Sequence, residues 1–107
     1  MMSKTYNVKE DIAQWLKDNH GILFNDILDA CEEGLQNEND HVHVATIKTS
    51  YGVTLLNLPS VETILESLRK SELNFVELED YERAARSRDC SAGWCKRKEI
   101  YKEKGLL

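Results

Sequence analysis

A scarcity of proline and glycine is the first feature of this sequence. One proline and five glycines among 107 residues are too few for a flexible linker or a low-complexity tail. Three cysteines, an odd number in a chain long enough to build its own core, do not indicate a disulfide framework. We therefore expect a single ordered domain over residues 1–107 with reduced thiols, and hence a cytoplasmic protein.

Long apolar runs and catalytic motifs are missing as well. The longest near-apolar run, Val53–Leu58, is far shorter than the roughly 20 residues of a membrane-spanning helix. The first residues, MMSKTYNVKED, contain no apolar segment typical of a secretory signal peptide. The sequence has no glycine-rich phosphate loop and no serine or cysteine nucleophile motif. We accordingly expect neither a membrane partner nor an enzyme.

The charged residues are distributed unevenly along the chain. Residues 1–82 contribute −10 to the net charge of −5, from six Lys and Arg against sixteen Asp and Glu. Residues 83–107 contribute +5, from eight basic residues against three acidic ones. This asymmetry is compatible with an interaction surface, and equally with two segments that screen each other in the fold. The basic segment 83–107 is a candidate for a partly independent helical extension.

The N-terminal part is predicted to form two helices. An acidic residue three positions after Asn7 has the spacing of a capping box, and Gly21 is placed to end the first helix. Asn25 is expected to cap a second helix, which ends at Gly34 or two residues later and is followed by a polar loop. The apolar stripe of the first helix consists of Val8, Ile12, Trp15 and Leu16.

The middle of the chain carries most of the strand-forming residues. Val42–Thr49 and Val53–Leu58 are rich in β-branched side chains, and Ser50–Gly52 between them suits a tight turn with a bulge glycine. With strict alternation neither face of this hairpin is cleanly polar, so we expect helices or a partner to cover it. The expected protein-interface residues are one face and the turn tyrosine: Val42, Val44, Thr46, Lys48 and Tyr51.

Helical signals dominate after the hairpin. Ser60 is an N-cap in front of a clean apolar stripe, which predicts a helix over residues 60–72. Asn74–Leu78 is compatible with a third strand, and a final helical segment is expected to be interrupted at Asp89–Gly93. The predicted fold class is therefore α+β, with two N-terminal helices, a hairpin or three-stranded sheet, a packed amphipathic helix and a C-terminal helical segment. The predicted core is Ile12, Trp15, Leu16, Phe24, Leu28, Ile47, Leu56, Val61, Ile64, Leu65, Leu68 and Val76.

Two histidines and two cysteines form a candidate metal site. His41 and His43 point the same way on a strand, and Cys90 and Cys95 have a spacing seen among zinc thiolates. Together they make an acceptable tetrahedral zinc set if the fold brings the two pairs together; otherwise we expect no cofactor. The alternative is two loop-edge histidines and two packing thiols. Basic neighbours of the two cysteines would also favour thiolate, which suits redox or nucleophilic use.

Basic and aromatic residues are interleaved in the C-terminal segment. This pattern suits phosphate contacts and base stacking, and the acidic remainder of the chain favours single strands or RNA over duplexes. The alternative is a solvated helix face that pairs with the acidic helices. The candidate nucleic-acid residues are Arg83, Arg86, Arg88, Trp94, Lys96, Arg97, Lys98 and Tyr101.

Protein binding is the function class that these patterns favour. We expect a small intracellular regulatory or inhibitory protein that binds another protein or a second copy of itself, because the hairpin needs cover and the charges are polarised. Nucleic-acid binding through residues 83–104 is the alternative. Small acidic chains without catalytic motifs are frequent among accessory and phage-encoded inhibitors.

Overall fold

The computed structural model describes residues 4–37 and 41–105, which form an α+β fold, as predicted. The expected loop residues 38–40 and the two C-terminal leucines lie outside the described residues. Within these ranges a three-stranded sheet is combined with four helices. The elements in chain order are β1 (Lys4–Asn7), α1 (Ile12–Asp18), α2 (His20–Gln36), β2 (Val42–Thr49), β3 (Gly52–Leu58), α3 (Val61–Glu77) and α4 (Tyr81–Glu103).

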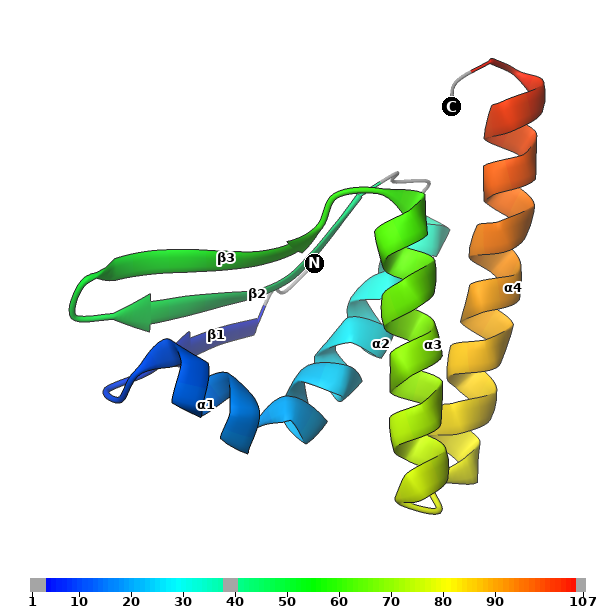
Figure 1. The fold of residues 1–107 in the computed structure, drawn as a ribbon. Coiled ribbons are helices and arrows are strands. Elements are labelled where there is room, and N and C mark those ends of the chain that lie inside the picture. Colours follow the sequence, from blue (N-terminus) through cyan, green and yellow to red (C-terminus); the bar gives the residue numbers. More distant parts are fainter. Residues whose placement is uncertain (1–3, 38–40, 106–107) are drawn as a thin grey trace.

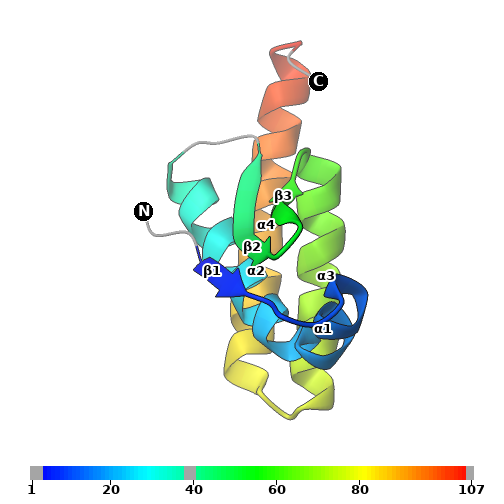
Figure 2. The same cartoon turned by 90° about the vertical axis from the view of Figure 1, so that its left-hand side faces the viewer.

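The sheet forms an arm that projects from a pair of long helices. Helices α3 and α4 stand side by side, and the hairpin of β2 and β3 extends away from them (Figure 1). Helices α1 and α2 run beneath the sheet, and α2 continues into the angle between the sheet and the α3–α4 pair (Figures 1 and 2). The last turns of α4 rise beyond the start of α3 (Figure 1). Helices α1 and α2 therefore cover one face of the sheet, and the α3–α4 pair stands at one end of it.

The third strand comes from the N-terminus. β1 pairs in parallel with β2, from Lys4 opposite Ala45 to Asn7 opposite Lys48, and β2 pairs antiparallel with β3. The hairpin is confirmed, but its turn is shorter than predicted: Gly52 pairs with Thr49 and forms no bulge, so only Ser50 and Tyr51 make the turn. Gly52 has a positive φ of 143°, which a side chain would disfavour. The alternative third strand at Asn74–Leu78 is wrong. That segment continues α3 because Phe75 extends the buried stripe of this helix.

The first helix begins later in the sequence than predicted. Asn7 ends β1, and α1 starts only after Asp11, whose carboxylate accepts a hydrogen bond of 3.3 Å from the backbone N–H of Gln14. The break between the two helices falls at Asn19, which donates through both its backbone N–H and its side chain to the carbonyl of Trp15. Gly21 therefore lies inside α2, and Asn25 is not a cap.

Helix α3 begins where it was predicted to begin. Helix α4 is continuous, although an interruption at Asp89–Gly93 was predicted. The Ser60 hydroxyl accepts from the backbone N–H of Thr63 at 3.3 Å, which caps α3. Helix α4 runs without interruption through Gly93, because the missing side chain there makes room for Leu35 of α2. A β-carbon at position 93 would come within 2.5 Å of the Leu35 Cδ2 atom. The close approach of α2 and α4 explains this glycine better than a helix break.

Two apolar clusters make up the core of the described residues. The larger joins α2, α3 and α4 to the base of the hairpin, and the smaller one consists of Val8, Trp15 and Ile47 under the sheet. All predicted core residues are buried or partly buried except Val76, which is exposed because it lies off the α3 stripe. Ala84, Cys90 and Trp94 of the basic segment belong to the larger cluster.

Candidate protein interface on the hairpin

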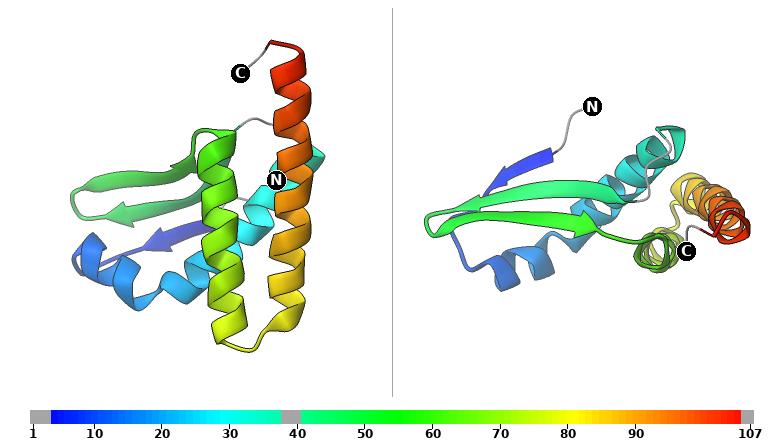
Figure 3. Two further views of the ribbon diagram at one scale, coloured as in Figure 1. Left: turned by 45° about the vertical axis from the view of Figure 1, so that its right-hand side comes forward. Right: turned by 90° about the horizontal axis from the view of Figure 1, so that it is seen from above.

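One face of the sheet is uncovered along most of its length. Helices α1 and α2 lie on the opposite face, and no helix of the described chain lies over the outer one (Figure 3). We call this surface the outer face. The cross-strand register places Thr46 beside Leu55 and Lys48 beside Val53 on it, with β1 continuing the row. Its residues are Thr5, Asn7, Thr46, Lys48, Val53 and Leu55, of which Thr46 is partly buried and the others are exposed.

A β-bulge decides which side chains reach this face. The register of β2 and β3 shifts between His43 and Ala45, so the alternation changes phase at this point. Val42 and Val44, both predicted to be interface residues, are buried as a result and belong to the core. His43 instead turns toward Thr46, whose hydroxyl lies 3.1 Å from its Nε2 atom, and its Nδ1 atom lies 2.6 Å from the Asn57 side-chain oxygen.

Three apolar side chains stand out at the free end of the hairpin. The exposed fractions are 99% for Tyr51, 61% for Val53 and 57% for Leu55. Thr49 fixes the turn that carries Tyr51, since its hydroxyl accepts from the Tyr51 backbone N–H at 3.1 Å and donates to the Gly52 carbonyl at 3.4 Å. The turn tyrosine is therefore presented on an ordered loop, directly before the strand that carries Val53 and Leu55.

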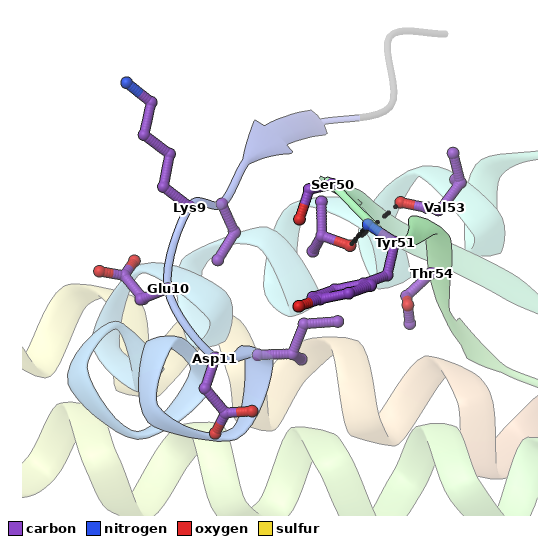
Figure 4. Close-up of a pocket in the computed structure, with 11 residues that line it drawn as sticks. Lys9, Glu10, Asp11, Ser50, Tyr51, Val53 and Thr54 are labelled. Atoms are coloured by element: carbon purple, nitrogen blue, oxygen red, sulfur yellow. Dashed lines mark hydrogen bonds between the residues drawn. The ribbon is translucent and has the colours of Figure 1, made fainter.

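A cleft of about 520 Å³ lies beside this turn. It is bounded by the β1–α1 connection, with Lys9, Glu10 and Asp11, and by the hairpin turn. Figure 4 shows the Tyr51 ring lying across the cleft, while Lys9 points away from it. The lining of the cleft therefore combines charged side chains with an exposed aromatic ring.

A second depression runs under the free edge of β3. It has a volume of about 320 Å³ and lies between that strand and helices α1 and α2. We call it the edge groove. Its lining is mostly aliphatic: Leu16, Leu23, Ile27, Val44, Leu55, Leu56, Asn57 and Leu58.

The basic segment is less available than its sequence suggests. Trp94 is completely buried, and its Nε1–H donates to the Cys31 carbonyl at 3.0 Å, so it cannot stack on a base. Arg97 lies over the Trp94 ring and donates to the carbonyls of Gly34 and Leu35, where it satisfies the C-terminal end of α2. These two candidate nucleic-acid residues are structural.

Three further basic candidates form ion pairs. Arg86 binds Glu32 at 2.5 Å and Asp29 at 3.4 Å, and these carboxylates raise the pKa of its guanidinium. Lys98 lies 3.3 Å from Glu62, and Arg83 lies 2.6 Å from Asp80. The alternative of a helix that pairs with acidic neighbours is confirmed for this part of α4.

A smaller basic surface remains near the C-terminal end of α4. A groove of about 550 Å³ lies between this end and α2, and Tyr101 contributes to it together with two exposed lysines. Arg88 also stays exposed and forms no ion pair within residues 4–37 and 41–105. The groove is lined by Leu35, Gly93, Lys96, Arg97, Ile100, Tyr101 and Lys104.

The candidate metal ligands are not brought together. Among the described residues no three His, Cys, Asp or Glu side chains form a group that could hold a metal ion. Cys90 and Cys95 point to different sides of α4, since the first is buried against α2 and the second is exposed. Burial raises the pKa of Cys90 to about 12 and also raises that of Cys31, which disfavours thiolate at both sites.

A buried polar pair was not anticipated from the sequence. The Tyr6 hydroxyl of β1 donates to the carboxylate of Asp26 in α2, and the ring packs on Trp15 with 5.1 Å between ring centroids. Burial raises the pKa of Asp26, although this hydrogen bond and Lys4 oppose the rise. Burial and the Asp26 carboxylate raise the pKa of Tyr6. A carboxylate on the buried side of an amphipathic helix is a signal that could have indicated this pair.

Comparison of the chain with protein-family models, curated proteins and solved structures gives no match. No helix in the described ranges combines the length and the apolar character needed to span a bilayer. The candidate site therefore stands on its geometry and exposed chemistry alone.

Proposed function

We propose that this protein is a small intracellular regulatory or inhibitory protein that acts by binding another protein through the outer face. The observation that carries the proposal is the exposed pair of Val53 and Leu55 on the outer face, next to the exposed turn residue Tyr51 that precedes the same strand. Apolar groups gathered in this way mark interaction sites more often than singly scattered ones do. Polar Thr46 and Lys48 rim the group, as is usual around the apolar centre of an interface.

The turn tyrosine is expected to provide most of the binding energy. Tyrosine is enriched among the few interface residues whose truncation costs about 2 kcal/mol or more. Thr49 orders the backbone of the turn that carries Tyr51, so little backbone entropy remains to be lost when a partner binds. Val53 and Leu55 supply apolar area next to it, at roughly 25 cal/mol for each Å² that a partner covers.

Affinity capture with mass spectrometry tests this function. The wild-type chain is compared with Tyr51→Ser and Leu55→Ser, in the presence of nuclease so that nucleic acid does not bridge proteins. Leu73→Ser on α3 is the matched control, because Leu73 is 58% exposed and Leu55 is 57% exposed. We expect one partner that is retained by wild type and Leu73→Ser, and lost at least tenfold by the other two variants. Retention by all four chains, or loss that includes the control, would contradict the proposal.

The basic groove on α4 supports a second candidate function. Lys96 and Lys104 flank Tyr101 there, and this arrangement suits one short stretch of single-stranded nucleic acid with phosphate contacts and one stacked base. Gel-shift assays at low salt with a single-stranded oligonucleotide would compare the wild type with a Lys96→Gln, Lys104→Gln chain. Lys9→Gln is the control, since Lys9 is an exposed cation at the other end of the molecule. Equal binding by all chains would remove the groove as a site.

A further inference from the structure

The two edges of the sheet differ in how they are protected. β1 at one edge has four residues and begins with a lysine, Lys4, and short charged edges resist pairing with other strands. β3 at the other edge has seven residues, Gly52–Leu58, and carries no charge. Its only proline neighbour, Pro59, follows the strand rather than interrupting it. β3 therefore lacks the devices that prevent another strand from adding to a sheet.

The surroundings of β3 also fit an added strand. The edge groove lies alongside and below the free edge, where Leu16, Leu23 and Ile27 leave aliphatic side chains open to solvent. A strand laid against β3 would satisfy the unpaired backbone groups of this edge. Its alternate side chains would point down into the edge groove, so the backbone and the apolar lining would be covered together.

We propose that a second copy of this chain occupies this edge, with the two β3 strands antiparallel about a two-fold axis. Charge favours this occupant, because a chain of net charge −5 meets its copy with least repulsion along an uncharged strand. The strand is also self-complementary. With Leu55, the middle residue, opposite its own copy, Thr54 of one chain faces Leu56 of the other over the edge groove.

The assembly is a continuous six-stranded sheet with both outer faces on the same side. Two seven-residue strands overlap over about 24 Å, which is a small interface by itself. The two edge grooves meet beneath the new strand pair and add their aliphatic side chains to the buried area. This places the contact near the lower end of specific interfaces, so we expect dissociation at about micromolar concentration.

Sedimentation velocity over a concentration series tests the dimer with the full chain. Wild type should pass from 12.3 kDa to twice that mass. Leu55→Lys should stay monomeric, because it sets two like charges opposite each other at the axis. Thr46→Lys is the matched control, since Thr46 lies beside Leu55 on the outer face but on the central strand. Thermal unfolding of each chain confirms that the variants fold.

Disulfide trapping gives an independent readout of the same contact. In a Cys95→Ser background the remaining cysteines, Cys31 and Cys90, are buried. Leu55→Cys should form a covalent dimer under mild oxidation, since residues opposite each other in an antiparallel pair lie within the range that a disulfide bridges. Thr46→Cys, one strand further in, should not.

Three results would overturn the dimer. The first is a wild-type chain that stays monomeric up to about 1 mM, the weak end of specific association. The second is that Leu55→Lys and Thr46→Lys weaken the dimer to the same extent. The third is that Leu55→Cys and Thr46→Cys form the covalent dimer equally well. Either of these two results would indicate that the sheets contact each other face to face. A monomeric chain that still captures its partner would overturn this inference and leave the proposed function standing.

Discussion

Gly34 of α2 lies directly against Trp94 of α4. A β-carbon on Gly34 would be 3.3 Å from the Trp94 ring and 2.8 Å from the Cγ2 atom of Val42. The indole is also held by its hydrogen bond to the Cys31 carbonyl and by Arg97, which lies over the ring. The glycine therefore allows β2, α2 and α4 to meet at one point in the core.

Gly34→Ala should lower the free energy of unfolding by about 1–3 kcal/mol, because the added methyl group overpacks a fixed site. This loss should appear even though alanine favours a helix by about 1 kcal/mol over glycine. Gly21→Ala is the control in the same helix, since a β-carbon at Gly21 meets nothing within 4 Å. It should leave the stability unchanged or raise it. Urea denaturation measures both, and equal effects of the two substitutions would contradict the close contact.

Only one thiol of the folded protein should react readily with a thiol reagent at pH 8. Cys95 is exposed, whereas Cys31 and Cys90 are buried and their raised pKa values keep them protonated. Titration with a chromogenic disulfide should show one fast equivalent in the native state and three after unfolding in guanidinium. Cys95→Ser should abolish the fast phase. A second fast equivalent in the native wild type would show that α2 and α4 open more easily than the packing indicates.

Asp26→Asn should raise or maintain stability at neutral pH. The folded state raises the pKa of Asp26 above its unfolded value near 3.8, so the folded chain binds this proton more tightly than the unfolded chain. The contribution of this group is therefore most favourable below that pH and is lost as the pH rises through the folded pKa. Asparagine resembles the protonated acid and can still accept from Tyr6.

The stability difference between Asp26→Asn and wild type should accordingly be largest near pH 7 and shrink as the pH falls toward 4. Urea unfolding at a series of pH values measures this difference. Tyr6→Phe is the companion variant, because it removes the donor and leaves Asp26 buried without it. It should destabilise the fold by about 1–3 kcal/mol. A difference between Asp26→Asn and wild type that does not vary with pH would show that the carboxylate does not titrate differently in the two states.

Local sequence signals correctly predicted the elements that depend only on neighbouring residues. The Ser60 cap, the regular stripe of α3 and the position of the hairpin turn are set by neighbouring residues, and all three were predicted. β1 was missed because its four residues have no apolar alternation and depend on partners about 40 residues later. Gly34 and Gly93 suggested breaks in helices because the sequence alone does not show that another helix packs closely against them.

The candidate site could be predicted only in part for a similar reason. Tyr51, Thr46 and Lys48 lie where the hairpin pattern places them, at the turn and on the outer face. Val42 and Val44 do not, because one bulge residue reverses the phase of the strand and no local motif marks it. The sequence of the basic segment predicts a binding surface. In the structure, ion pairs with residues distant in the sequence neutralise part of its charge.

The parallel pairing of β1 with β2 has a consequence for the order in which the chain folds. The hairpin and the α3–α4 pair are joined by short turns, whereas Lys4 meets Ala45 only after a loop of about 40 residues is closed. Closing that loop costs conformational entropy that four backbone pairings repay poorly, so β1 should join last. Its amide hydrogens should exchange with solvent through local opening, well before those of β2. Local opening of β1 would then expose the edge of β2 that β1 covers.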